Sequence, residues 1–166
     1  MARVNLYNFL APLSPAPGGL IWADQNAPRP AKPYATVTVR SVDPSPPVSA
    51  RVDAAGVIAM TQVIRLSVEW QFIGKNALDL ARMAAFRIRS ETNLDRAKEL
   101  GLGILNIDSV YPVPEVLNAS QIEERAIVEM AVLDSDAFGD NVGLIEEVEI
   151  IGDGFCTITV RDTDNG

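Results

Sequence analysis

Residues 60–73 read MTQVIRLSVEWQFI and form the strongest periodic segment of the chain. Apolar and polar side chains alternate along it, which is the period of a β-strand with one buried face. If the stretch stays straight it spans about 45 Å, whereas most strands are five or six residues long. We therefore expect a strand that curves strongly or runs beyond its own domain and meets another surface. Its apolar face holds Met60, Ile64, Leu66, Val68, Trp70 and Phe72.

A helix is predicted directly after this strand. Gly74 ends the alternation, Asn76 can cap a helix, and residues 77–89 follow the helical period. The small and branched apolar side chains fall on one arc, which we expect to face the core. That arc holds Ala77, Leu80, Ala81, Ala84 and Ile88.

Further strands are predicted on both sides of this strand and helix. A second helix is expected over 93–100, with Thr92 as its cap and Gly101 just past its end, and residues 134–143 read as a loop. The fold class is therefore α+β, a mostly antiparallel sheet with helices packed on one face. The predicted strands are 20–22, 34–42, 104–111, 126–133, 144–151 and 155–161, the last two joined by a glycine-rich hairpin at 152–154.

The chain of 166 residues is expected to form a single domain over 1–166. Six of its eleven prolines lie in residues 1–33, which predicts mostly extended backbone there, with residues 1–18 as an N-terminal arm. Residues 153–166 are expected to form a C-terminal hairpin strand and a frayed tail.

Composition excludes several classes of function. Histidine is absent, which removes histidine-dependent nucleophilic catalysis and most zinc sites. The single cysteine, Cys156, excludes internal disulfides and Cys-cluster metal sites, and it reads as a core residue of an intracellular chain. The net charge of −8 makes the chain a poor binder of nucleic acid. No run is apolar enough to span a membrane, so we expect a soluble, cytosolic domain.

No set of residues assembles a predicted active site. Asp134, Asp136 and Gly139 match part of a calcium-binding loop, but Ile145 stands where the bidentate glutamate belongs. The adjacent pair Glu123–Glu124 reads as part of a solvated face. We expect no enzymatic activity and no metal or cofactor, although a small ligand-binding domain or enzyme remains the alternative.

The exposed side of the predicted helix is the candidate functional site. Arginines beside apolar side chains are typical of a protein interface, and a solvated face is the alternative. From residue 134 onward there are nine acidic residues and only one basic residue, Arg161. We therefore hypothesise that the basic stripe of the helix faces the acidic edge of a neighbouring copy in a head-to-tail ring. The predicted interface residues are Lys75, Leu78, Arg82, Phe86 and Arg89, with Ala85 beside them.

The segment IWADQNAPRPAKPYATVTV, residues 21–39, resembles the phage neck terminator family, the tail-terminator proteins of long-tailed phages. The matching features are a short apolar strand, Gln25-Asn26, spaced prolines, and Pro33-Tyr34 leading into a second strand. The later order is similar, with a helix opening near Asn76, a strand opening at 124–126 and the strand IEEVEIIG at 145–152. The similarity covers roughly residues 20–152.

This resemblance implies a virion structural protein with a terminator-like α+β fold. Proteins of the family form a ring, usually a hexamer, that caps the tail tube, stops its polymerisation and joins the tail to head-completion proteins. The implied partners are other copies of the chain, the tail tube protein, head-completion or neck proteins and the tail sheath. DNA is expected to pass through without specific binding, and no membrane is involved. The expected location is the virion tail or neck, with assembly in the host cytoplasm. Another tail-tube or baseplate component is the alternative within the same biology.

Overall fold

The computed structural model describes the backbone of residues 2–26, 28–52, 56–118, 121–141, 147–151 and 157–161. The chain divides into two compact units. Unit 1 consists of Met1–Pro46 and Gln62–Asp136, and unit 2 consists of Pro47–Thr61 and Ala137–Gly166. Two long strands, β4 (Val57–Ile73) and β8 (Arg125–Asn141), contribute residues to both units.

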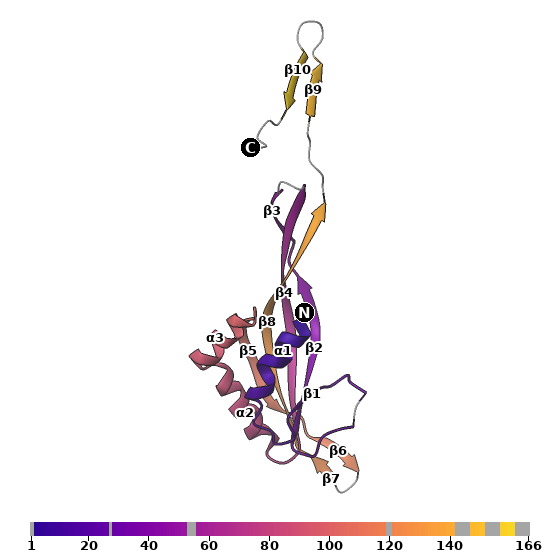
Figure 1. Ribbon diagram of the computed structural model, residues 1–166. Helices are drawn as coiled ribbons and strands as arrows, with labels where there is room; N and C mark the ends of the chain where they lie inside the picture. Colours follow the sequence, from indigo (N-terminus) through magenta and orange to yellow (C-terminus); the bar gives the residue numbers. More distant parts are fainter. Residues whose placement is uncertain are drawn as a thin grey trace. The chain divides into compact units, whose positions relative to one another are not determined.

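The sheet of unit 1 confirms the predicted α+β class (Figure 1). Its strands lie in the order β1-β2-β4-β8-β5, where β1 is Leu20–Trp22, β2 is Tyr34–Pro44 and β5 is Gly103–Pro112. The β2–β4 and β5–β8 pairs are antiparallel, and β1 runs parallel to β2 at the edge. The sheet is therefore mixed but mostly antiparallel.

The long alternating strand forms as predicted and begins three residues earlier, at Val57. Within unit 1, every second side chain from Ile64 to Phe72 is buried. The ring centroids of Trp70 and Phe72, the last two side chains of this row, lie 5.0 Å apart. In unit 2 the first residues of β4 pair with β3 (Val48–Val52), where Val48 lies opposite Thr61.

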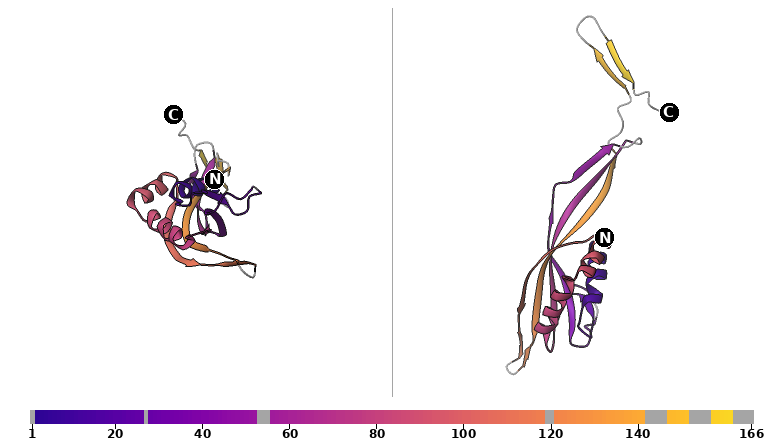
Figure 2. Two further views of the ribbon diagram at one scale, coloured as in Figure 1. Left: turned by 90° about the horizontal axis from the view of Figure 1, so that it is seen from below. Right: turned by 90° about the vertical axis from the view of Figure 1, so that its left-hand side faces the viewer.

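Three helices cover one face of the unit 1 sheet, as the views from below and from the side show (Figure 2). They are α1 (Ala2–Leu10), α2 (Ala77–Ile88) and α3 (Glu91–Glu99), and the short 3-10 helix η1 (Ala11–Leu13) follows α1. The hydrophobic core fills the space between these helices and β2, β4 and β8.

The expectation of extended backbone at the N-terminus is wrong, because residues 2–10 form α1. Leu6, Phe9 and Leu10 are fully buried in the core. The Tyr7 hydroxyl donates a hydrogen bond of 2.9 Å to the carbonyl of Leu20, which ties the helix to β1. The physical reason is that the first proline, Pro12, falls after the helix, in η1, so the proline-rich composition applies only to later residues.

The second helix begins at Glu91, two residues earlier than predicted, with Ser90 rather than Thr92 at the N-cap. Its predicted end is confirmed, because Gly101 adopts a φ of 73° just past the helix. The amide of Gly101 donates to the carbonyl of Lys98, and the amide of buried Leu102 donates to that of Ala97. This pair of bonds is a Schellman motif, which glycine favours at this position.

The predicted loop at 134–143 is wrong over its described part, since β8 continues to Asn141. Gly139 lies close to β4, where an added Cβ would come within 3.1 Å of Val57 Cγ1. The glycine therefore permits close packing in a strand rather than a turn. In unit 2, β9 (Glu147–Ile151) and β10 (Thr157–Arg161) pair antiparallel as predicted. The hairpin turn 152–154, Cys156 and the tail 162–166 lie outside the described residues.

Candidate functional site

Helix α2 places the predicted interface residues on its solvent side. Its core arc is buried as expected, with Leu80 partly buried. Ala85 departs from the prediction, because it is buried rather than beside the basic stripe. Phe86 is 78% exposed, and Leu78 and Met83 are exposed on the same helix. The exposed predicted residues are Lys75, Leu78, Arg82, Phe86 and Arg89.

The turn between β4 and α2 fixes where this surface begins. Asn76 occupies the N-cap position, but its side chain makes no capping hydrogen bond, so that part of the prediction is wrong. Glu124 takes over the role, because its carboxylate accepts a 2.8 Å hydrogen bond from the Asn76 amide. Its backbone carbonyl also accepts from the Gly74 amide at 2.9 Å. The segment before β8 therefore anchors the start of α2.

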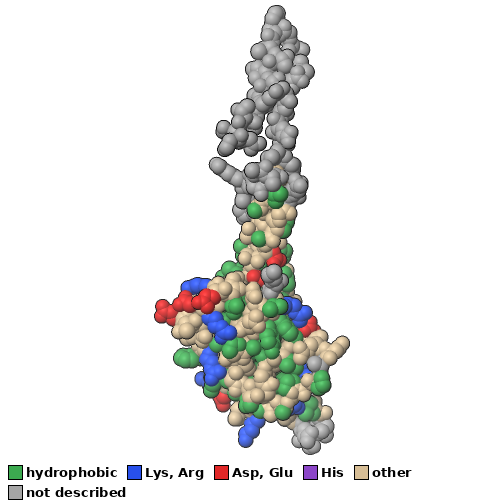
Figure 3. Space-filling view, in the orientation of Figure 1, with side chains coloured by type: hydrophobic (Ala, Val, Ile, Leu, Met, Phe, Trp, Pro, Cys, Tyr) green, Lys and Arg blue, Asp and Glu red, His purple; other side chains and the backbone are tan. Residues whose placement is uncertain are grey.

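The cations of α2 fall into two groups. Arg87 Nη1 donates to the Leu13 carbonyl at 3.2 Å and so holds α2 against η1. Within the described part of the chain, Lys75, Arg82 and Arg89 take part in no ion pair or side-chain hydrogen bond. Basic side chains line the left flank of unit 1 in Figure 3, where α2 and α3 lie in Figure 1. These charges are available to a partner.

A second exposed surface lies on a hairpin that the sequence analysis missed. Strands β6 (Glu115–Asn118) and β7 (Gln121–Glu123) form a two-stranded sheet of their own. Val116 pairs across the strands with Ile122, and the two side chains are 69% and 70% exposed. The signals that could have revealed this hairpin were the proline pair around Val113 and the short apolar groups on either side of the polar stretch 118–121.

Ion pairs hold the base of this hairpin. Glu115 and Glu123 face each other across the two strands, and Arg125 forms ion pairs with both. Lys32 forms a further ion pair with Glu123. The expectation that Glu123 is solvated is wrong, since only 6% of its side chain is exposed. This carboxylate joins the segment of Lys32 to the segment that contains Arg125, and Arg125 in turn binds Glu115. These ion pairs hold the base of a hairpin too small to be stable alone.

The ionisation of Glu123 follows from these contacts. Burial alone raises the pKa of the Glu123 carboxyl, but hydrogen bonds from Lys32 and Arg125 outweigh it. The attraction of the two cations acts in the same direction, so the pKa lies below its ordinary value. Glu123 is therefore charged across the neutral pH range.

The sheet face opposite the helices carries a polar network. Glu129 of β8 accepts hydrogen bonds of 2.7 Å from Ser109 and from Tyr111, and these bonds lower the pKa of its carboxyl. The bond to Glu129 in turn raises the pKa of Tyr111. On the neighbouring strands, Arg40 Nε donates to Glu69 at 2.7 Å. These groups satisfy one another, which is the pattern of a structural surface.

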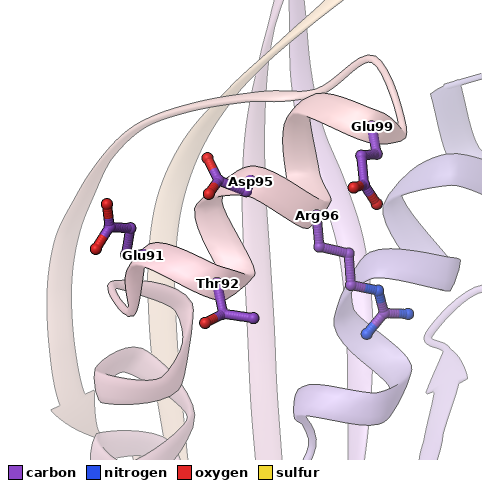
Figure 4. A pocket seen from close by; sticks show the side chains of 5 residues that line it. All are labelled: Glu91, Thr92, Asp95, Arg96 and Glu99. Carbon is purple, nitrogen blue, oxygen red and sulfur yellow. The ribbon is translucent and has the colours of Figure 1, made fainter.

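A depression on α3 offers no convergent chemistry (Figure 4). All five of its lining side chains come from this one helix, and they spread along it rather than meeting at a point. Arg96 turns toward α1 and donates to the Asn8 carbonyl at 2.8 Å. Among the described residues, no group of three or more acidic, histidine or cysteine side chains is placed to hold a metal ion.

The comparisons with known proteins identify the family. A family model described as phage neck terminator protein matches residues 4–163, nearly the whole chain. The chain belongs to the phage neck terminator family. The search of curated proteins gives no match. The resemblance carried by residues 21–39 is thereby confirmed.

Membership in the neck terminator family establishes the broad role. The chain is a bacteriophage tail or neck terminator protein and hence a component of the virion, and the role of such a protein is structural rather than enzymatic. None of the helices that the structure describes has the length and apolar character needed to cross a membrane. The solvent side of α2 and the outer face of the β6–β7 hairpin both carry exposed apolar side chains and are candidate interaction surfaces.

Proposed function

We propose that this neck terminator forms a hexameric ring at the head-proximal end of the phage tail tube. The ring ends polymerisation of the tube and joins the tail to head-completion proteins, with the tail sheath as a further neighbour where one is present. The partners are thus other copies of the chain, the tail tube protein and neck proteins.

The observation that carries this proposal is the solvent side of α2. Phe86 stands 78% exposed between Arg82 and Arg89, and neither arginine has a charged partner among the described residues. Aromatic side chains and arginines are the residues most enriched at the centres of protein interfaces. A helix face of this composition supports a contact with another protein, and in a ring protein the first such contact is with the next subunit.

The passage of DNA through the ring is part of the proposal. The chain carries a net charge of −8, which opposes association with a phosphate backbone. We therefore expect no retention of double-stranded DNA by the purified protein in a mobility-shift assay at low salt. A stable complex of the protein with DNA under these conditions would contradict the proposal that DNA passes through the ring without binding.

The first experiment measures assembly. Native mass spectrometry of the full chain at several concentrations, with negative-stain images of the same samples, should show a closed ring. The double variant Arg82→Glu/Arg89→Glu should shift the distribution toward monomers. Arg65→Glu/Lys98→Glu is the matched control, because it changes the net charge equally on other elements. Unchanged assembly in the α2 variant would remove this helix from the ring contact.

The second experiment tests the terminator activity on the tube itself. The purified chain, carrying a small label, is added to polymerising tail tube protein and imaged by negative stain. We expect label at one end of each tube and a shorter distribution of tube lengths. Label along the tube wall would instead assign the chain to another tail component.

A further inference from the structure

The β6–β7 hairpin and α2 offer complementary surfaces on one unit. The outer face of the hairpin presents Val116 and Ile122, while the carboxylates that anchor its base, Glu115 and Glu123, are held by Arg125. The two aliphatic side chains are a cross-strand pair, so they project from the same side of the ribbon. They are exposed to about 70% in the part of the chain that the structure describes. Because ion pairs fix the base of the hairpin and its outer side chains are apolar and exposed, its outer face is suited to contact with another protein.

The charges of the two surfaces are opposite. Residues 75–89 contain four cations and Asp79, a net charge of +3. The base of the hairpin combines Glu115, Glu123 and Glu124 with Arg125 and the paired Lys32, a net charge of −1. Both surfaces also have an exposed apolar centre. On the helix it consists of Phe86 and Met83, and on the hairpin it consists of Val116 and Ile122. Apolar centres surrounded by charges of opposite sign are the composition expected of two halves of one interface.

The apolar centres of the two surfaces do not cover each other within one copy. Phe86 is 78% exposed, and Val116 and Ile122 are 69% and 70% exposed. Both surfaces belong to unit 1, where α2 lies at the lower left of Figure 1 and the hairpin at the lower right. They meet where the hairpin ends and the helix begins, at the hydrogen bond from the Asn76 amide to Glu124. A contact between two different surfaces is head-to-tail, and such contacts close into rings when the rotation per subunit allows it.

We propose that the β6–β7 hairpin of each copy docks on the solvent side of α2 of the next copy. The exposed ring of Phe86 lies against Val116 and Ile122, and Arg82 and Arg89 lie beside the acidic base of the hairpin. The occupant of both surfaces is a second copy of this chain. This inference rests on the proposed ring, and it adds the two surfaces that join neighbouring subunits.

Cross-linking between two single-cysteine chains tests the contact. In a Cys156→Ser background, one chain carries Val116→Cys and a second, differently tagged chain carries Phe86→Cys. A short bis-maleimide reagent should link the mixture into heterodimers containing both tags, while each chain alone should give no cross-linked dimer. A cross-linked dimer from a single-cysteine chain alone would show that like surfaces meet and would overturn the proposal.

Apolar-to-acidic variants give an independent readout. Val116→Asp and Phe86→Asp should each reduce the assembled fraction at least tenfold at a fixed concentration. Val4→Asp is the control, since Val4 is 63% exposed on α1, away from both surfaces. Thermal unfolding of each variant establishes that its fold is retained, and the cross-linking assay decides the matter if a variant does not fold.

The outcomes separate this inference from the proposed function. If rings form, but neither the cross-link nor the effect of the acidic variants is seen, the hairpin contact is wrong and the ring stands. If the chain stays monomeric at every concentration, both alone and with tail tube protein, the ring and the contact fall together.

Discussion

Glu123 is the residue on which the candidate interface depends most closely. Its buried carboxylate, at the end of β7, accepts hydrogen bonds from Lys32 and Arg125. Glu123→Gln removes the charge while keeping the size of the side chain. We expect the free energy of unfolding at pH 7 to fall by about 1–2 kcal/mol, because charge-assisted hydrogen bonds weaken. Urea denaturation of the variant and of exposed Glu91→Gln as control measures the difference.

The same carboxylate gives the chain a defined dependence on pH. The pKa of Glu123 is lowered in the folded state from an ordinary value of 4.5. A carboxyl with a depressed pKa stabilises the fold above its unfolded pKa, and that contribution is lost as pH falls through the folded pKa. The wild type should therefore exceed Glu123→Gln in stability throughout the range above pH 4.5 and lose this advantage in more acidic solution. An advantage that persisted far below that pH would contradict the charged ion pair.

Gly74 is constrained by both conformation and space. Its φ is +113°, and an added Cβ would lie 3.1 Å from Lys32 Cβ and from Pro33 Cα. Gly101 has a φ of +73° but open space around it. We expect Gly101→Ala to cost about 1 kcal/mol for the backbone alone, and Gly74→Ala to cost about 2–3 kcal/mol. Equal losses in parallel thermal unfolding would show that the neighbouring segment moves aside.

At the scale of elements, the two faces of α2 have different tasks. Ile88 is fully buried beneath the helix, whereas Met83 faces solvent. Ile88→Ala leaves a cavity in the core and should lower the free energy of unfolding by about 2–4 kcal/mol. Met83→Ala should change it by less than about 0.5 kcal/mol, since surface substitutions rarely matter to the monomer. Urea titrations at a concentration where the chain is monomeric measure both, and a large loss for Met83→Ala would place that side chain in the core.

Elements with a strong period could be predicted from the sequence alone. The strand around Trp70 and the buried arc of α2 follow from spacing, because burial of one face imposes that spacing. Helix α1 was missed although Leu6, Phe9, Leu10 and Leu13 have helical spacing. The six prolines of residues 1–33 predicted extended backbone for the whole segment, whereas all of them follow the helix. The turn-forming residues near the end of β8 stay in a strand because neighbouring chain supplies contacts, as at Gly139.

The candidate site also has one part that could be predicted from the sequence and one that could not. The exposed residues of α2 were predictable, since a helical period assigns the solvent side as directly as the buried one. The β6–β7 hairpin was not, because its apolar pair is short and its base is held by ion pairs, one of them from Lys32, which lies 91 residues before Glu123. Long-range ion pairs leave no periodic signal in a sequence. The burial of Glu123 is the clearest case.

At the scale of the whole molecule, two electrostatic effects oppose each other during assembly. Every copy carries a net charge of −8, so approaching copies repel at long range. The surfaces on α2 and the hairpin carry +3 and −1, the latter with Lys32 counted, and therefore attract at short range. Salt acts on these two effects differently, because the screening length falls from about 30 Å at 0.01 M to about 3 Å at 1 M.

This contrast predicts that the assembly constant passes through a maximum with salt. Raising sodium chloride from 0.01 M to about 0.1 M should strengthen assembly, because repulsion between whole copies is screened first. Raising it further to 1 M should weaken assembly severalfold, because contact charges are then screened as well. Sedimentation equilibrium across this range measures the effect. In Arg82→Glu/Arg89→Glu the decline at high salt should vanish, since that contact has become repulsive. A wild-type assembly that strengthened steadily up to 1 M would instead mean that the apolar pairs alone hold the subunits together.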